Sequence, residues 1–223
     1  SASAVYDHLN KKKFKPICLY ISKNGMWKVV DSPKCADEKE PFSSFLPWNT
    51  KNNTELPESS VYFPVLHGPY GEDGTIQGLL ELADVPYVGA AVLSSAIGMD
   101  KAMAKSIFKA KGLPLARYDV FYENNWVQDR KIVTEKIKKK YSTPFFIKPS
   151  NLGSSIGITK VQSLSQLSEA IHLAFSYDNK ILIEEAIEGR EFECSVLGNE
   201  NPVSSLPGEI IPSRTFYDYQ DKY

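Results

Sequence analysis

The sequence is poor in cysteine, nearly neutral in charge and free of long apolar runs. Cys18, Cys35 and Cys194 are odd in number and widely separated, so they form neither a disulfide framework nor a metal or redox spacing, and free thiols suit a reducing compartment. Lys and Arg number 26 against 27 Asp and Glu, a formal net charge of -1, which excludes a general basic field for a nucleic-acid partner. No apolar run approaches the roughly 18 residues that cross a bilayer, so we expect neither a membrane segment nor a secretory leader.

The composition that is present is that of an ordinary globular protein. Hydrophobic residues make up 42% and charged residues 24%, which excludes a coiled coil or a disordered chain as a description of the whole. A length of 223 residues suggests one large domain or two packed ones. The chain opens with Ala2, Val5 and Leu9 spaced as on one face of a helix and ends at Tyr223 in a polar and aromatic stretch. We therefore expect a fragment that has been cut at both ends.

The first part of the chain predicts strands that alternate with helices. This alternation is typical of an α/β domain with a mostly parallel sheet. The predicted elements are a hairpin of strands at 16–22 and 26–30, a loop at 31–60, a buried strand at 61–66, a helix capped by Thr75, and a longer helix from about 95 to 111.

The rest of the chain predicts a second group of strands and helices. A tight turn at Gly189 predicts that the strands on either side of it pair with each other. The predicted elements are strands at 118–121 and 145–148, a Lys-rich helix near 131–140, an amphipathic helix at 165–176, and paired strands at 181–185 and 191–197.

A strand that ends at Lys148 leads into a loop rich in glycine and serine, which extends to Gly157. Such a loop can expose backbone N–H groups and hydroxyls to an anion, and the lysine adds a point charge for a phosphate. The Gly-Lys-Ser/Thr order of a Walker A loop is missing. A hairpin turn with an incidental lysine explains the segment about equally well, so both interpretations stay open here.

An acidic segment, which includes Glu184, Glu185 and Glu191, follows an apolar strand. Adjacent carboxylates could accept hydrogen bonds from an amino group, and Glu191 could accept them from hydroxyls, both of which a nucleoside offers. The backbone at Glu185 and Ile187 could bind the edge of an adenine. A solvated acidic hairpin is the alternative, and for this segment alone it is favoured.

Two further loops have the composition of ligand-binding segments. His67 opens a loop dense in glycine and polar groups, directly after a predicted strand, where ligands bind in open α/β sheets; a tight turn with a structural histidine is the alternative. Residues 214–223 hold three tyrosines and two cations, which predicts either a closing lid or a surface loop with aromatic anchors. Lys101 alone carries no weight, because a lone lysine on a helix is usually solvated.

The order and spacing of these segments together are more specific than any one of them. The segments at 67–78, 99–101, 146–158 and 216–223 closely resemble the D-alanine–D-alanine ligases, a family of the ATP-grasp superfamily, and the resemblance covers essentially the whole chain. It implies three parts: an N-terminal α/β substrate domain at 1–98, a central ATP-grasp subdomain of α+β type at 99–185, and the start of a C-terminal catalytic domain at 186–223.

The resemblance implies an ADP-forming ligase that joins two D-alanines for peptidoglycan precursor synthesis in the cytoplasm. In this family ATP phosphorylates the carboxylate of one D-alanine, and the amine of a second attacks the resulting acyl phosphate. The site must therefore neutralise phosphoryl charge and exclude water. Complete members generally form homodimers.

The resemblance also implies site residues by position. The nucleotide-binding residues are Lys101 and Lys148 for the phosphates, Gly153, Ser154 and Ser155 in the loop that closes on them, Glu184 for the adenine amino group, Glu185 and Ile187 for the hinge backbone, and Glu191 for the ribose. The catalytic residues are His67, Ser154, Lys222 and Tyr223, and Tyr217 and Tyr219 share a lid loop with Lys222.

Two parts of the family pattern are expected outside this chain. The glycine-rich loop with its catalytic glutamate would precede Ser1. The carboxylates and the asparagine that hold two Mg²⁺ or Mn²⁺ ions, with an arginine for the oxyanion, would follow Tyr223. No metal ligand is therefore expected within the chain itself.

Three alternatives stay open. A D-alanine–D-lactate or D-alanine–D-serine ligase is close, although the Tyr-Asp-Tyr-x-x-Lys-Tyr lid at 217–223 favours the dipeptide enzyme. A non-catalytic nucleotide-binding module is the second, and a stop codon after Tyr223 would favour it, whereas a downstream Asp-x-Phe…Asn-Glu-x-Asn stretch would favour an enzyme. Another ATP-grasp ligase lacks support at 67–78 and in the lid.

We predict that residues 1–223 alone do not catalyse ligation, because the metal ligands are expected beyond them. The purified chain is incubated with ATP, magnesium and D-alanine, and ADP release is measured. Robust turnover would contradict the prediction.

Overall fold

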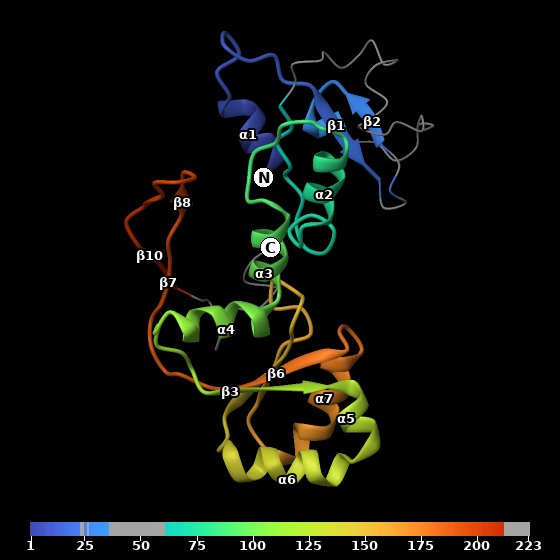
Figure 1. The fold of residues 1–223 in the computed structure, drawn as a ribbon, viewed down its shortest axis with the longest axis vertical. Coiled ribbons are helices and arrows are strands. Elements are labelled where there is room, and N and C mark those ends of the chain that lie inside the picture. Colours follow the sequence, from blue (N-terminus) through green and yellow to red (C-terminus); the bar gives the residue numbers. More distant parts are fainter. Residues whose placement is uncertain (23–24, 26, 36–60, 212–223) are drawn as a thin grey trace. The chain divides into compact units, whose positions relative to one another are not determined.

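The computed structural model describes residues 1–22, 25, 27–35 and 61–211. The chain divides into two compact units, residues 1–96 and 97–223, and each is described by itself (Figure 1). The three-part division at 1–98, 99–185 and 186–223 stays a prediction. In the described ranges, no helix has the length and apolar character that a membrane span requires.

The first unit contains an antiparallel hairpin and a short amphipathic helix. In the hairpin, Cys18 pairs with Val30 and Ile21 with Trp27, which confirms the predicted pair of strands. Trp27 is buried together with Ile76 and Leu80 of the helix. The elements are α1 (Ala2–His8), β1 (Cys18–Ile21), β2 (Trp27–Val30), the 3-10 helix η1 (Pro33–Cys35) and α2 (Thr75–Leu82).

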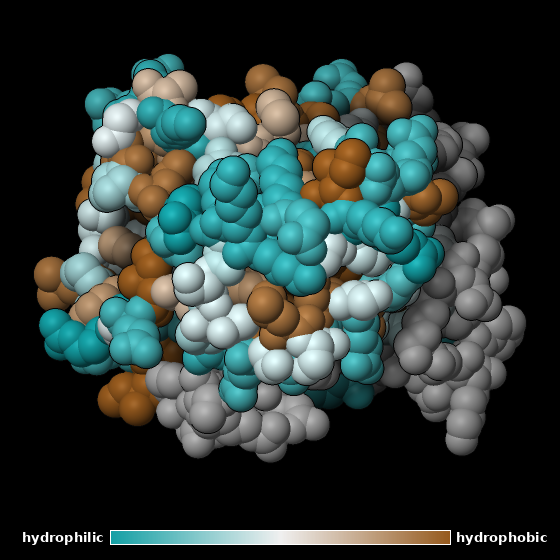
Figure 2. Space-filling view, turned by 90° about the horizontal axis from the view of Figure 1, so that it is seen from below, coloured by the Kyte–Doolittle hydropathy of each residue, from teal (hydrophilic) through white to brown (hydrophobic). Residues whose placement is uncertain are grey.

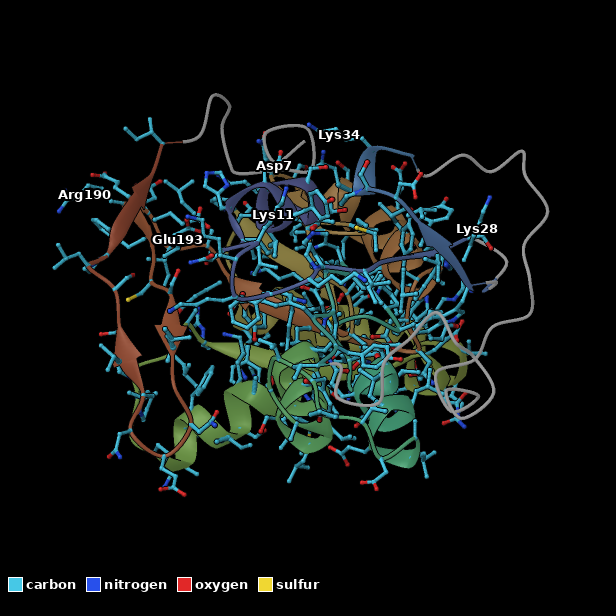
Figure 3. All side chains as sticks on the ribbon, turned by 90° about the horizontal axis from the view of Figure 1, so that it is seen from above. Asp7, Lys11, Lys28, Lys34, Arg190 and Glu193 are labelled. Atoms are coloured by element: carbon cyan, nitrogen blue, oxygen red, sulfur yellow. The ribbon has the colours of Figure 1, made fainter. Side chains whose placement is uncertain are left out.

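A surface ion pair joins the first helix of this unit to η1. The Lys34 ammonium lies 3.6 Å from a carboxylate oxygen of Asp7, and both side chains are exposed (Figure 3). Exposed pairs of this kind contribute about 0–1 kcal/mol, so the contact adds little to stability.

The predicted buried strand at 61–66 is wrong. The segment forms one isolated parallel bridge, in which Tyr62 donates its N–H to Pro86 and accepts from the N–H of Val88. Val61 and Phe63 on either side of Tyr62 are exposed, and the rest of the segment is half-buried at most. In the described part of this unit, the predicted mostly parallel sheet is represented by that bridge alone.

Thr75 does not cap α2, contrary to the prediction. Gly74 is the N-cap, with φ at +94°, and Thr75 is the first helical residue. A carboxylate oxygen of Asp73 accepts the N–H of Thr75 at 3.0 Å. The side-chain acceptor at this helix start therefore belongs to the residue before the N-cap Gly74.

The single helix predicted from about 95 to 111 is two helices, α3 (Val92–Met99) and α4 (Lys101–Ala110). Asp100 separates them, because its extended backbone ends α3 while its side chain accepts the N–H groups of Ala102 and Met103 as the N-cap of α4. The apolar spacing continues across the break, and for that reason periodicity did not reveal it.

The second unit contains a four-stranded antiparallel sheet in the order β3-β6-β4-β5, which with its helices confirms the predicted mixture of helix and sheet. Two small antiparallel pairs, β7 with β10 and β8 with β9, accompany it. The elements are β3 (Tyr118–Tyr122), α5 (Glu123–Gln128), α6 (Arg130–Lys140), β4 (Phe145–Pro149), β5 (Thr159–Val161), η3 (Leu164–Gln166), α7 (Leu167–Phe175), β6 (Lys180–Glu185), β7 (Glu191–Glu193), β8 (Val196–Leu197), β9 (Val203–Ser204) and β10 (Gly208–Ile210).

The predicted pairing of the strands around Gly189 is wrong. β6 lies in the interior of the sheet, hydrogen-bonded to β3 on one edge and to β4 on the other. Because both of its edges are occupied, the strand that follows Gly189 must pair elsewhere. β7 pairs with β10, with Phe192 opposite Glu209.

The two faces of the four-stranded sheet have different partners. α5, α6 and α7 cover one face, and α4 lies on the other side of β3 and β6 (Figure 1). On the covered face, Phe145, Ile147, Ile181 and Ile183 are buried with apolar side chains of the three helices. Complete burial of such a side chain is worth about 1.5–3 kcal/mol, so this layer stabilises the sheet and leaves the opposite face for polar groups.

α6 shows how the Lys-rich stretch fits this layer. Val133 and Ile137 point into the core, whereas Lys131, Lys136 and Lys138 are exposed. Seen from below, a band of hydrophilic side chains crosses the surface, with hydrophobic patches beside it (Figure 2). These three lysines therefore lie on the solvent-exposed side of α6, whereas Lys140 pairs with Asp119.

Replacement of Ile137 by alanine should lower the free energy of unfolding by about 2–5 kcal/mol, because its side chain is 0% exposed in the core. Ile132→Ala on the same helix is the matched control, since Ile132 is 66% exposed, and should change stability by less than about 0.5 kcal/mol. Urea unfolding followed by circular dichroism measures both. Equal losses in the two variants would contradict the assigned helix orientation.

Candidate functional site

The sheet face opposite the core carries a row of polar and aromatic side chains. The strand register places Tyr118 of β3, Glu184 of β6, Phe146 of β4 and Lys160 of β5 side by side across the four strands. Residues at directly opposed positions point to the same face of a sheet. The acidic segment and the strand that carries Lys148 are thus adjacent.

Glu184 lies between two lysines. One carboxylate oxygen pairs with the ammonium of Lys148 on β4, and the other pairs with the ammonium of Lys105 on α4. The Glu184 side chain is only 9% exposed. Burial would raise the pKa of the Glu184 carboxyl, but the charges and hydrogen bonds of Lys148 and Lys105 outweigh burial and hold that pKa below its ordinary value.

Aromatic rings support both lysines. The ammonium of Lys105 lies 5.1 Å from the ring centroid of Tyr118, and that of Lys148 lies 5.1 Å from the ring centroid of Phe146. Both distances are within the range of cation–π attraction. Since Tyr118 and Phe146 are the two cross-strand neighbours of Glu184, the two lysines approach its carboxylate from opposite sides.

Asp100 fixes α4 against the ends of β4 and β6. Its carboxylate accepts the hydroxyl of Ser150 at 2.7 Å and pairs with the ammonium of Lys180, in addition to capping α4. Burial would raise the pKa of Asp100, but these bonds from Lys180, Ser150 and the N–H of Met103 hold it below its ordinary value. The helix that carries Lys101 and Lys105 is therefore anchored at its first residue.

Lys101 lies where this anchor meets the glycine-serine loop. Its N–H donates to the carbonyl of Ser150 at 3.0 Å, and its ammonium donates to the carbonyl of Leu152. Burial, and then the positive charge of Lys148, lower the pKa of Lys101, although nearby carboxylates act in the opposite direction. The two predicted phosphate lysines are thus close enough to repel each other, which favours a shared anion.

The loop after β4 has an unusual backbone. Ser154 and Ser155 have φ angles of +50° and +60°, which are uncommon for residues with a side chain. Gly157 has φ of +70°, and a Cβ there would lie 2.8 Å from side-chain atoms of Pro149 and Tyr177. Glycine is therefore required at 157, whereas a Cβ at Gly153 would meet nothing within 4 Å. Backbone strain of this kind concentrates at ligand-binding segments.

A cavity of about 600 Å³ lies beside this face. Apolar and charged residues share its lining, as in sites that take a flat apolar group together with an anion. The predicted site residues in its lining are Lys148, Ser155, Ile187 and Glu191, and Lys160 and Arg190 also line it. Arg190 lies at the β7 side, where it pairs with Glu209 at 3.6 Å (Figure 3).

Other predicted residues lie near the cavity without lining it. Gly153 and Ser154 belong to the adjoining loop, and Glu184 is held by Lys148. Glu185 is engaged elsewhere, because its N–H donates to the carbonyl of Arg117 at 3.0 Å and its carboxylate accepts the N–H of Arg117 at 2.6 Å. A backbone donor for an adenine edge would therefore have to come from Ile187.

His67 belongs to the first unit. Its Nε2 lies 3.0 Å from the hydroxyl of Ser1. Carboxylates of Glu72 and Asp73 accept backbone N–H groups of Gly68 and Tyr70 and thus hold its loop in shape. Burial would raise the pKa of Asp73, but the bonds from Tyr70 and Thr75 lower it. The lid residues Tyr217, Tyr219, Lys222 and Tyr223 lie outside the described residues.

Sequence reasoning missed Lys105 and Asp100. Lys105 follows Lys101 by four residues, a spacing that places both on one face of a helix, so helical periodicity could have found it. Asp100 precedes Lys101 and has the chemistry of an N-cap, which was a signal for a helix start that the continuous apolar spacing concealed. In the described ranges, no group of three or more His, Cys, Asp or Glu side chains could hold a metal ion, so we assign none of these residues to a metal.

Two family models match the chain. The one described as D-ala D-ala ligase N-terminus matches residues 1–90, and the one described as D-ala D-ala ligase C-terminus matches residues 107–223. The chain belongs to the D-alanine–D-alanine ligase family. The recognition made from the motifs is thereby confirmed, and the architecture is the ATP-grasp fold of these ligases, as expected.

Relatives of this family align along the entire chain. A D-alanine--D-alanine ligase of Thermoanaerobacter pseudethanolicus is 48% identical over 237 residues, and one of Natranaerobius thermophilus is 43% identical over 236 residues. Both alignments cover 100% of this chain. The chain spans 66% of the length of the Thermoanaerobacter relative and 65% of the length of the Natranaerobius relative.

Solved structures of the family are also similar. The VanG D-Ala:D-Ser ligase from Enterococcus faecalis has a TM-score of 0.83 at 34% identity and covers 100% of this chain and 67% of its own. The D-alanine-D-alanine ligase from Coxiella burnetii has a TM-score of 0.79 at 31% identity and covers 94% of this chain and 66% of its own.

Glu184→Gln should destabilise the chain in a pH-dependent way. Because the folded pKa of Glu184 is depressed, its ionised form stabilises the fold above the unfolded pKa of about 4.3, and this stabilisation is lost as the pH falls through the lower folded pKa. The difference in free energy of unfolding between wild type and variant should be largest near neutral pH and shrink below about pH 4. Urea unfolding from pH 3 to 7 measures it.

Glu135→Gln is the matched control, since the Glu135 carboxylate is 72% exposed in its pair with Lys138. It should leave stability nearly unchanged at every pH. A Glu184→Gln effect that did not vary with pH would contradict the depressed pKa.

Proposed function

We propose that this chain is the nucleotide-binding part of an ATP-dependent, ADP-forming ligase that joins two D-alanines through a D-alanyl phosphate. The observation that carries the proposal is the grouping of Lys148, Glu184 and the glycine-serine loop beside one cavity. Membership of the ligase family supports the same reaction.

In the proposed complex the nucleotide lies along the cavity. Lys148 and Lys101 neutralise phosphate oxygens, and N–H groups and hydroxyls of the loop at Ser154 and Ser155 donate to them. Burial and the charge of Lys148 lower the pKa of Lys101, and a phosphate anion beside it would offset both effects, so the charged lysine becomes more stable in the complex.

In this proposal the base lies beside Glu184, next to Lys148, and the sugar lies beside Glu191. Glu184 accepts from the adenine amino group, Ile187 contributes backbone to the base edge, and Glu191 accepts from ribose hydroxyls. The position of Ile187 and Glu191 in the cavity lining supports these roles. Glu185 is the weakest of the proposed hinge residues, because its backbone N–H already donates to Arg117.

For the chemical steps we propose His67, Ser154, Lys222 and Tyr223, as the family resemblance implies. Mg²⁺ or Mn²⁺ would supply charge neutralisation on the phosphates, and we assign none of the described residues to hold it. We place the reaction in the cytoplasm, where its product feeds peptidoglycan precursor synthesis, and expect the complete enzyme to be a homodimer.

A D-alanine–D-serine ligase is the second candidate. The likeness to the solved D-Ala:D-Ser ligase, at a TM-score of 0.83, favours keeping it. The lid sequence at 217–223 favours the dipeptide product from D-alanine alone.

The protein expressed from its complete open reading frame should release ADP from ATP and Mg²⁺ only when D-alanine is present. Lys148→Met should weaken ATP binding by about tenfold or more, because it removes a charge-assisted contact to phosphate. Isothermal titration measures binding, and mass spectrometry of the product from mixed D-alanine, D-serine and D-lactate identifies the second substrate. Lys131→Met, an exposed lysine on α6, is the control and should bind ATP as wild type does.

ATP binding without any D-alanine-dependent ADP release would support the non-catalytic module instead. Absence of ATP binding in the wild type would overturn the proposal as a whole.

A further inference from the structure

Glu184 has two lysine partners, Lys105 and Lys148, and the proposed function requires one of them, Lys148, to bind a phosphate as well. Lys148 lines the cavity and is proposed to neutralise a phosphate. In the structure its ammonium pairs with Glu184. When the Lys148 ammonium binds a phosphate, it binds the Glu184 carboxylate less strongly. ATP binding would therefore remove part of the positive charge that compensates Glu184.

An uncompensated carboxylate at this depth is costly. The Glu184 side chain is 9% exposed, and removal of one partner from a buried pair leaves the other charge without a partner in a medium of low dielectric. Such a carboxyl tends to take up a proton, because desolvation disfavours its charged form. A protonated Glu184 would no longer be a pure acceptor for the base.

Lys105 is placed to prevent this. Its ammonium pairs with the carboxylate oxygen of Glu184 that Lys148 does not use, from a position that is 18% exposed. It approaches from α4, over the ring of Tyr118, on the side of Glu184 opposite Lys148. Asp100 anchors the first turn of this helix to β4 and β6, so Lys105 holds its place independently of Lys148.

We propose that Lys105 is the positioning residue that keeps Glu184 ionised and oriented while Lys148 serves the phosphates, and that it thereby sets the preference for a 6-aminopurine nucleotide. This inference rests on the proposed ATP function. An ionised carboxylate only accepts hydrogen bonds, so it matches the amino group of adenine and opposes the 6-oxo group of hypoxanthine. A protonated carboxyl can donate to that oxo group and discriminates less between the two.

Lys105→Met in the complete protein tests the inference with ATP and ITP as probes. We expect the dissociation constant for ATP to rise by about tenfold and the ratio of ITP to ATP dissociation constants to fall by about fivefold or more. The ratio should fall further as the pH is lowered from 8 to 6, because Glu184 then protonates more readily. Isothermal titration measures both nucleotides.

Lys109→Met is the matched control, since Lys109 is exposed on the same helix, and it should leave both constants unchanged. Lys105→Arg keeps the charge and should retain most of the ATP preference. Lys105→Gln removes the charge but keeps a donor, and should behave like Lys105→Met. A loss of discrimination in Lys105→Met and Lys105→Gln but not in Lys105→Arg supports a role of the Lys105 charge, because a purely structural contact would not produce this pattern.

The outcomes separate the inference from the proposed function. If wild type binds no ATP, the proposed function fails. If wild type prefers ATP and Lys105→Met keeps the same preference, the inference alone fails.

If neither Lys105→Met nor Lys105→Gln folds, a measurement on the wild-type protein tests the inference. The pKa of the Glu184 carboxyl is followed by carbon-13 NMR with and without ATP. The inference requires that this pKa stay below its ordinary value when ATP is bound, and a rise above that value would overturn it.

Discussion

A carboxylate withdrawn from water requires positive partners, and the polar face of the second unit is organised around this requirement. Glu184 sits on an interior strand with both edges hydrogen-bonded, so its backbone is fixed, and its side chain is only 9% exposed. Its partners must come from outside the strand, one from the neighbouring β4 and one from α4. The position of α4 is therefore set by charge as well as by packing.

A second group of charges makes this arrangement rigid. The Asp100 carboxylate accepts a hydrogen bond from the Ser150 hydroxyl at the end of β4 and pairs with the Lys180 ammonium at the start of β6. Ser150 in turn donates its N–H to the carbonyl of Lys180. Asp100 thus joins the start of α4 to the ends of β4 and β6, and Lys105, about one helical turn later, joins α4 to Glu184 of β6. Lys101 and Lys105 are four residues apart on α4 but have different partners. Lys101 contacts the glycine-serine loop, and Lys105 contacts the Glu184 carboxylate.

The sequence predicted well where one local pattern determined the structure. It located β6 from an apolar run, which is buried on both faces, α7 from its 3.6-residue spacing, and α6 from a Lys-rich stretch. It failed where the outcome depended on distant chain. The strand after Gly189 pairs with β10 because β3 and β4 already occupy β6, which no local pattern records. The motif residues Lys148 and Glu184 were found, but their ion pair, and the part of Lys105 in it, depend on strand register and helix placement.

The sheet that carries this site ends, among the described strands, at β5, a strand of three residues with Lys160 at its centre. An open strand edge invites another chain to add to it, and shortness and a central charge both discourage such addition. The lysine at the cavity therefore also protects the sheet from edge-to-edge aggregation, so a substitution there to an apolar residue would affect solubility during synthesis as well as the cavity.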